Sequence, residues 1–395
     1  MTIPDVLDRP TPIRLLILQP TPFCNLDCDY CYLPNRAATH RMSAEILHAA
    51  VDIVRRSGLI GEELNVVWHA GEPLVVPAEF YEEAFDAISV RVGDLPVNHA
   101  IQTNGTLITD QWCKLFKTRR VRVGVSLDGP AHIHDRHRFD RAKRPTHDRV
   151  MRGIDLLQAN GVPFHVICVV TADAIDHPEA LVQFFSDARI DRVGFNFEEQ
   201  ESVRRFSTLA SLPSDRSVRT FLERVYRYNN ALPEPLQIRE FHGALSALMP
   251  RTSEEPLWGS NDQVRPFGIV SVDCDGNLST FSPELLGASS PVHPTFTFGN
   301  VLRDELIDVL ENSAFLEVAT QIAEGVRMCA RTCEYFKLCG GGAPSNKLYE
   351  NHTFASTETL HCRNSIQLPI DIVLADLEHR FGIARDPAAD AAAAP

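Results

Sequence analysis

Residues 24–31 read CNLDCDYC and follow a short apolar run at residues 13–18. The run brings Cys24, Cys28 and Cys31 together, and the next cysteine, Cys113, lies far downstream. Iron–sulfur clusters that only transfer electrons take four cysteine ligands. Three thiolates without a nearby fourth therefore predict a four-iron cluster with one iron left open for chemistry. The alternative is a structural zinc site, which usually needs a closed tetrahedral ligand set.

Apolar strand patterns alternate with helical patterns around this stretch, which is typical of βα units on a parallel sheet. In segment 43–57, apolar residues recur at helical spacing and Ser43 stands at the N-cap position. The sequence therefore predicts an α/β fold with parallel strands. The predicted strands are 14–19, 64–69, 97–103, 121–127, 163–171 and 193–198, and the predicted helices are 43–57, 78–92, 110–116, 149–160 and 178–188.

Glycines and polar residues gather where these strands end, which is the edge at which parallel barrels place their sites. Asn-Gly-Thr and Asp-Gly-Pro turns are common in isolation, but their recurrence at successive strand ends predicts a single site. The sixth strand ends in an aromatic run with Asn196 and Glu198, which we expect to face a cofactor. The other strand-end segments are 69–73, 102–106 and 126–130.

Composition favours a cytoplasmic enzyme. A net charge of −14 argues against nonspecific binding to nucleic acid or to an anionic membrane. No signal peptide or run of about 18 apolar residues is present, so the ten cysteines are expected to be ligands and core thiols rather than disulfides. Two basic stretches, 117–122 and 136–149, are interpreted as solvated faces or helix ends.

A second set of four cysteines lies near the C-terminus. A run of three glycines at 340–342 directly follows the third of them. Four thiolates complete the ligand set of one 4Fe–4S cluster, but a structural zinc site uses similar spacing. Spacing alone does not decide between the two. Cys113 and Cys168 lie in apolar contexts and are expected to be core residues. The four cysteines are Cys329, Cys333, Cys339 and Cys362.

The Cys-x3-Cys-x-aromatic-Cys pattern after an apolar strand resembles the signature of the radical S-adenosylmethionine enzymes. The resemblance implies that Cys24, Cys28 and Cys31 bind a 4Fe–4S cluster whose unique iron is chelated by S-adenosylmethionine. One electron then produces a 5′-deoxyadenosyl radical, which abstracts a hydrogen atom from the substrate. The resemblance also implies a partial (β/α)6 barrel of the TIM type.

The same resemblance implies roles for residues around the cofactor. Segment 69–73 is similar to the family's Gly-Gly-Glu-Pro segment, which binds the cofactor's amino group, with Ala70 in place of the first glycine. The implied contacts are Tyr30 near the adenine, Gly71 and Glu72 at the amino group, Ser126 and Arg138 at the ribose and carboxylate, and Thr103 and Asn104 lining the site.

The C-terminal cysteines resemble the SPASM domain of peptide-modifying radical enzymes, which usually has seven cysteines and two auxiliary clusters. Here Cys274 stands alone in the predicted hairpin around residues 275–277, and the missing cysteines all belong to the first auxiliary cluster. The four cysteines that match the second auxiliary cluster are present. We therefore expect two clusters in total, with Cys274 unligated.

Segments 279–287, 340–348 and 356–362 resemble those of maturases that act on glycine-rich-repeat precursor peptides, a cyclophane-forming (triceptide) group. These enzymes join an aromatic ring carbon to the β-carbon of a nearby residue. The resemblance implies a precursor peptide as substrate and a flavodoxin- or ferredoxin-type reductant. The base that takes the ring proton is predicted to be Glu284 or Asp275, since burial raises the pKa of a carboxylate; alternatively, Glu284 is an ordinary hairpin residue.

The predicted organisation is an N-terminal extension (1–13), a barrel core (14–200), a helical connecting region (201–262), a SPASM-like domain (263–375) and a tail (376–395) with a disordered end. No leader-binding domain fits before the first strand, so leader recognition falls to the barrel, the connecting region or a separate partner. Other hypotheses are a sulfatase-maturase-like or thioether-forming enzyme, disfavoured by the missing auxiliary cysteines, and a noncatalytic electron carrier, disfavoured by the open iron.

Overall fold

The computed structural model describes residues 12–204, 206–212, 216–249 and 261–382. Its strands form one ten-stranded sheet in the order β10-β9-β8-β1-β2-β3-β4-β5-β6-β7. Neighbouring strands from β1 to β6 are all parallel, which confirms the predicted parallel α/β core. Their bounds are β1 Ile13–Leu18, β2 Ile60–Trp68, β3 Val97–Thr103, β4 Arg122–Ser126, β5 Phe164–Val170 and β6 Arg192–Phe197.

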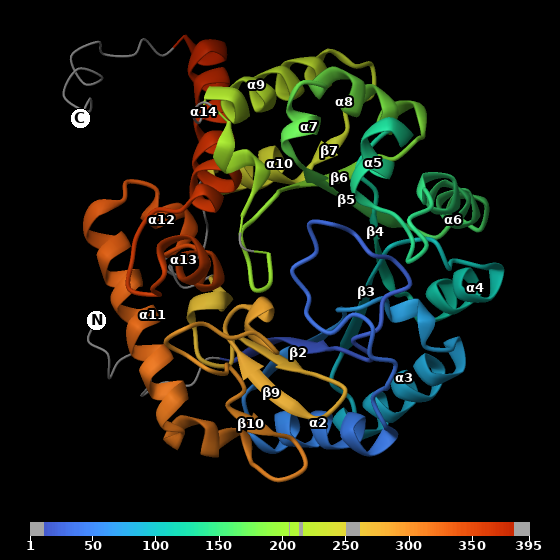
Figure 1. The fold of residues 1–395 in the computed structure, drawn as a ribbon, viewed down its shortest axis with the longest axis vertical. Helices are drawn as coiled ribbons and strands as arrows, with labels where there is room; N and C mark the ends of the chain where they lie inside the picture. The colour runs from blue at the N-terminus through green and yellow to red at the C-terminus, as the bar shows by residue number, and fades with distance from the viewer. Residues whose placement is uncertain (1–11, 205, 213–215, 250–260, 383–395) are drawn as a thin grey trace.

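Helices surround these strands as an outer ring (Figure 1). The first of them begins after Ser43, whose hydroxyl accepts a hydrogen bond from the Ile46 N–H at 3.2 Å, as the N-cap prediction requires. The helices of this part are α2 Ala44–Arg56, α3 Ala78–Val92, α4 Asp110–Arg119, α5 Ala131–His137, α6 His147–Ala159, α7 Ala172–Ile175 and α8 Pro178–Asp187.

Strand β2 begins at Ile60, four residues before the predicted start at 64. Residues 61–63, near the start of this strand, lack apolar side chains and are exposed, so the sequence pattern gives no sign of a strand there. The pairing with β1 is irregular at this point, because Ile13 pairs with Ile60 whereas Leu15 pairs with Asn65.

The C-terminal half continues the same sheet. Strand β7 extends it beyond β6, and β8 pairs in parallel with β1, so the sheet runs across the predicted domain boundaries at 200 and 262. The predicted hairpin is confirmed as the antiparallel pair β8 and β9. These elements are α9 Arg216–Ala231, β7 Gln237–Ile238, α10 Arg239–Leu248, β8 Ile269–Val272, β9 Asn277–Thr280 and β10 Gly299–Asn300.

The last helices lie beside the barrel (Figure 1, orange to red). They are α11 Ser313–Thr332, α12 Phe336–Cys339, α13 Pro344–Asn351 and α14 Leu368–Phe381, with a π-helical turn, η7, at Cys362–Gln367. Residues 1–11 of the predicted extension and 383–395 of the predicted tail lie outside the described residues. No described helix is both long and apolar enough to cross a membrane.

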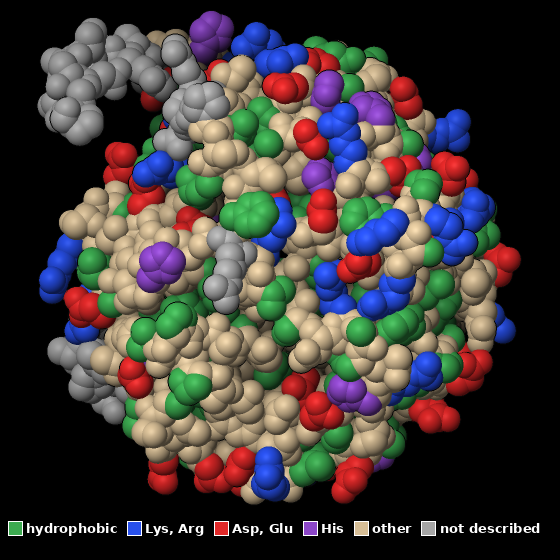
Figure 2. All heavy atoms as spheres, in the orientation of Figure 1, with side chains coloured by type: hydrophobic (Ala, Val, Ile, Leu, Met, Phe, Trp, Pro, Cys, Tyr) green, Lys and Arg blue, Asp and Glu red, His purple; other side chains and the backbone are tan. Residues whose placement is uncertain are grey.

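One hydrophobic core joins the barrel to the C-terminal elements. Cys113 and Cys168 belong to it with no solvent exposure, as predicted. On the face shown in Figure 2, Lys and Arg side chains lie among Asp and Glu side chains rather than in a separate patch.

Candidate active site

The three N-terminal cysteines lie in the loop between β1 and α2, at the carboxyl end of the first strand. Burial, together with neighbouring anionic groups that include the other thiols, raises the pKa of Cys24 to about 12 and that of Cys28 to about 11. The Leu26 N–H donates a hydrogen bond to Cys24 Sγ at 3.4 Å. Thiols that repel one another as anions, and that receive an N–H donor, fit a shared cationic iron centre.

Basic side chains from segment 136–149 bind this loop while remaining exposed to solvent, so the solvated face that the sequence predicted also contacts the cysteine loop. Arg141 donates to the Cys24 carbonyl at 2.7 Å, and Lys143 forms an ion pair with Asp27 at 2.6 Å. The Leu26 backbone also forms an isolated β-bridge with Asp140. The stretch therefore fixes the position of the cysteine loop over the barrel.

The segment after β2, residues 69–73, packs against the start of the cysteine loop. A Cβ on Gly71 would lie 2.5 Å from the Thr21 carbonyl oxygen, so only glycine fits there. The buried Glu72 carboxylate accepts hydrogen bonds from the Thr103 hydroxyl at 2.6 Å, from the Asn104 N–H at 2.7 Å and from a further backbone N–H. Burial raises the pKa of Glu72 to about 7, although these hydrogen bonds act to lower it. Glu72 thus ties two strand ends together.

Ala70, which replaces the first glycine of the family's segment, has a φ of +72°. A side chain in this left-handed region costs about 1–2 kcal/mol. We expect Ala70→Gly to raise the free energy of unfolding by about 1 kcal/mol, measured by denaturant unfolding. Ala49→Gly, inside helix α2, is the matched control and should lower it by about 0.5–1 kcal/mol. A loss of stability in Ala70→Gly would contradict the strain.

A buried ion pair occupies the end of β4. Arg138 Nε lies 2.9 Å from Asp128 Oδ2, and the guanidinium carbon lies 5.3 Å from the centre of the Tyr30 ring. The Tyr30 hydroxyl also donates to Asp128. Although burial opposes ionisation of Asp128, Arg138 and its other partners hold its pKa below the usual value. Three residues from three segments therefore form one rigid wall.

The four C-terminal cysteines all lie at helix ends and line one small cavity. Cys329 is in the last turn of α11, and Cys333 caps that helix. Burial and the neighbouring thiols raise the pKa of Cys333. Lys347 Nζ lies 3.2 Å from Cys329 Sγ, and the Gly341 N–H donates to Cys339 Sγ at 3.5 Å. Cationic and N–H donors around a tetrathiolate fit an anionic iron–sulfur centre.

The glycine run after Cys339 is required by this packing. Gly342 has a φ of +74°, and a Cβ there would lie 3.2 Å from Cys362 Sγ. The π-helical turn begins at Cys362, and such turns are frequent at functional sites.

Cys274 and Asp275 lie elsewhere. The Asp275 side chain is 61% exposed and bonds His40 at 3.2 Å, and neither Cys274 nor Asp275 lines the main cavity. The ligand atoms of His40, Cys274 and Asp275 lie within 4.8 Å of one another. The structure thus separates Asp275 from the residues that line the cavity, whereas Glu284 is one of them.

A cavity of about 850 Å³ lies between the barrel and the C-terminal helices, within the usual range for ligand sites. Cys28 and Cys31 of the first set and Cys339 of the second line the same space. Gly71, Glu72, Thr103 and Asn104 are not among its lining residues. The predicted residues that do line it are Tyr30, Ser126, Arg138, Asn196, Glu198 and Glu284.

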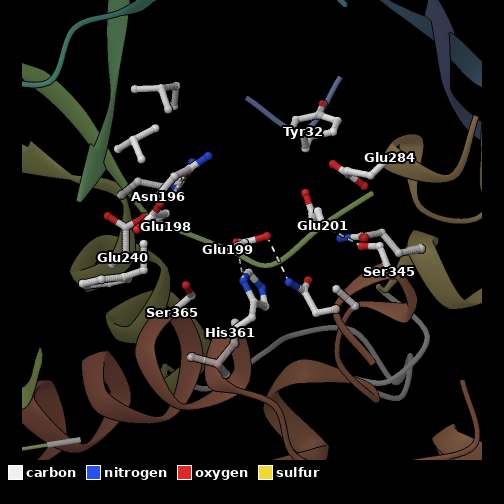
Figure 3. A pocket seen from close by; sticks show the side chains of 18 of the residues that line it. Tyr32, Asn196, Glu198, Glu199, Glu201, Glu240, Glu284, Ser345, His361 and Ser365 are labelled. Carbon is white, nitrogen blue, oxygen red and sulfur yellow. Dashed lines mark hydrogen bonds and ion pairs between the residues drawn. The ribbon is translucent and has the colours of Figure 1, made fainter. Parts of the chain in front are cut away.

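An acidic group in this cavity was missed by the sequence analysis (Figure 3). Glu199 bonds His361 at 2.7 Å and accepts a hydrogen bond from Asn346 at 3.0 Å. Glu201 accepts a hydrogen bond from Ser345 at 3.1 Å. Burial raises the pKa of Glu284 to about 7, and Glu199 adds to the shift. The three glutamates within residues 198–201, directly after β6, were the available signal.

Comparison with known proteins identifies the family. Residues 18–197, from the end of β1 to the end of β6, match the Radical SAM superfamily. The uncharacterized protein sll1766 of Synechocystis is 41% identical over 378 residues, covering 94% of each chain. The chain belongs to the radical SAM superfamily. Its cofactors are accordingly a 4Fe–4S cluster and S-adenosylmethionine.

Other relatives of this radical SAM protein modify proteins or peptides. A serine-type anaerobic sulfatase-maturating enzyme of Bacteroides thetaiotaomicron is 25% identical over 355 residues, 85% of this chain and 83% of its own. The solved structure of anSMEcpe with AdoMet and the Cp18Cys peptide aligns with a TM-score of 0.73 at 21% identity, over 93% of this chain and 98% of that one. SuiB of Streptococcus suis, bound to precursor peptide SuiA, aligns with a TM-score of 0.61 at 17% identity, over 89% and 76%. These structures confirm the predicted fold.

Proposed function

We propose that this radical SAM enzyme modifies a ribosomally made precursor peptide by joining an aromatic ring carbon to the β-carbon of a nearby residue. The observation that carries the proposal is that both cysteine sets border one cavity containing a glutamate with a raised pKa. The similarity of segments 279–287, 340–348 and 356–362 to the cyclophane-forming maturases supports this chemistry over other peptide modifications.

In this proposal Cys24, Cys28 and Cys31 hold the first cluster, and Cys329, Cys333, Cys339 and Cys362 hold one auxiliary 4Fe–4S cluster. When bound, S-adenosylmethionine on the first cluster supplies hydrogen-atom abstraction after one-electron reduction by a flavodoxin- or ferredoxin-type protein, and the auxiliary cluster supplies an electron acceptor.

The protein's own residues position and deprotonate the substrate. Tyr30, Ser126, Arg138, Asn196 and Glu198 form the barrel side of the cavity and are proposed to bind the cofactor. Cross-linking breaks one Cβ–H bond, forms one C–C bond and removes one proton and one electron from the ring. Glu284 takes that proton, because a base with a pKa near 7 is poised for proton transfer at neutral pH.

We expect Glu284→Gln to lower the rate of cross-linking by about 10²-fold, while reductant-dependent 5′-deoxyadenosine formation persists. In the unmodified enzyme, cross-linking should rise with pH through about 7 as the carboxyl ionises, and this rise should be absent in the variant. The exposed Glu83→Gln on α3 is the charge-matched control. Full turnover by Glu284→Gln would remove Glu284 from the mechanism.

The direct test is anaerobic turnover with a glycine-rich precursor peptide that has repeated aromatic-x-x motifs, encoded beside the gene. The product should be lighter by two hydrogen atoms, and deuterium at the substrate Cβ should appear in 5′-deoxyadenosine. Resistance of the linked residues to backbone fragmentation in tandem mass spectrometry would locate the new bond. No mass loss from such a peptide would contradict the proposal.

A second candidate is serine or cysteine oxidation, favoured by the nearly full-length similarity to sulfatase-maturating enzymes. Oxidation of a serine hydroxymethyl group also removes two hydrogen atoms, but it leaves a carbonyl. A product that reacts with a hydrazide reagent and fragments normally would therefore support this candidate instead.

A further inference from the structure

We infer that the cavity has a subsite, formed by Glu201 and Glu284, that binds a positively charged Lys or Arg side chain of the peptide. The inference rests on the proposed function in one respect, that a peptide enters this cavity. It adds a substrate class, because it requires a cationic residue close to the position that is modified.

Five glutamates line the cavity, and three of them have cationic partners. Arg138, which also lines it, is already paired with Asp128. These partners neutralise most of the barrel side of the cavity. The three pairs are Glu198 with Arg204, Glu240 with Arg239, and Glu199 with His361.

Among the residues that the structure describes, neither Glu201 nor Glu284 forms an ion pair with Lys, Arg or His. Glu201 accepts a hydrogen bond from the Ser345 hydroxyl and shares a hydrogen bond with Glu199, and His361 acts on Glu284 only from beyond ion-pair distance. Acceptor capacity therefore remains on both carboxylates. Two carboxylates in a half-enclosed space are costly unless a cation compensates them. The cavity is therefore complementary to a positive group supplied by its occupant.

The two carboxylates come from segments that are far apart in the sequence. Glu201 follows β6, and Glu284 stands in the short turn after β9. In Figure 3 they lie near each other beneath the Tyr32 ring, with Glu199 and His361 on the far side of Glu201. Tyr32 directly follows Cys31, so a cation held between Glu201 and Glu284 would place its peptide backbone close to the first cysteine set.

Proton occupancy agrees with this geometry. Burial, followed by Glu199 and Glu284, raises the pKa of Glu201 well above its usual value, and burial raises that of Glu284 to about 7. Both carboxyls are therefore easier to protonate than exposed glutamates when no cation is near. A bound Lys or Arg would favour the ionised form of these carboxyls and would in turn be attracted by them.

The experiment uses the anaerobically reconstituted enzyme with S-adenosylmethionine and two fluorescent glycine-rich peptides. Both contain the same aromatic residue, and they differ only by Arg or by its neutral near-isostere citrulline two positions later. Fluorescence anisotropy should show binding of the Arg peptide at least about tenfold tighter, which corresponds to about 1.4 kcal/mol. Equal affinities, or failure of both peptides to bind, would overturn the inference.

The variant E201Q/E284Q should bind the two peptides with equal affinity, whereas Glu83→Gln should keep the preference for Arg. If the double variant does not fold, as judged by its melting curve, the single variant Glu284→Gln should reduce the preference at least threefold. Retention of the full preference in a folded variant would place the cation elsewhere and overturn the inference.

The outcomes for the two proposals are separable. Preference for Arg without a cross-linked product would leave the subsite standing and contradict the proposed function. If both peptides bind with equal affinity and both are cross-linked, only the subsite is contradicted.

Discussion

Cys28→Ala is expected to abolish reductant-dependent cleavage of S-adenosylmethionine and to remove about four irons per chain. Cys28 is buried in the loop after β1 and within electrostatic reach of Arg138 and Cys31, so the substitution removes one of the three thiolates of the first set. Iron content, sulfide content and 5′-deoxyadenosine would be measured on anaerobically reconstituted protein.

Cys113→Ala is the matched control for this substitution. Cys113 is fully buried and packs from α4 into the hydrophobic core, so its loss should leave the iron content and cofactor cleavage unchanged. Undiminished iron and cleavage in Cys28→Ala would contradict the assignment of the first cysteine set.

Cys339→Ala should separate the two cysteine sets. Because Cys339 ends α12 and lies with three other thiols around a small cavity, its loss should remove about four further irons while cofactor cleavage continues. Peptide cross-linking should fall below detection, since the ring electron then has no acceptor. Metal analysis and product mass spectrometry would measure both effects.

Cys274→Ala is the control for the second set, and it should keep all iron and full cross-linking. Cys274 lies beside Asp273 and Asp275, away from the four thiols. Loss of zinc rather than iron in Cys339→Ala would show that the second cysteine set is a structural zinc site.

The sequence predicted the barrel well because its strands and helices have strong periodicity. Strand β3 and helix α3 have the predicted bounds, and the Ser43 cap forms as expected. The start of β2 was missed because residues 61–63 are polar and exposed, so only the pairing with β1 makes them a strand.

The site was predicted where a short segment is sufficient and was missed where distant segments meet. The cysteine loop and the Gly71–Glu72 segment are local patterns. In contrast, Glu199, Glu201 and His361 were missed, and they meet the predicted Glu284 only because β8 pairs with β1 and α13 packs against residues 199–201. Neither contact follows from hydrophobic periodicity. The solvated basic residues of segment 136–149 also bind the cysteine loop, and this long-range contact has no signal in the sequence.

The central claim is that this radical SAM protein uses two iron–sulfur clusters beside one cavity. The most direct test is to count iron and sulfide per chain after anaerobic reconstitution and to assay reductant-dependent 5′-deoxyadenosine in the same sample. The account predicts about eight irons together with cofactor cleavage. About four irons with bound zinc would contradict the second cluster, and full clusters without cleavage would contradict the radical chemistry itself.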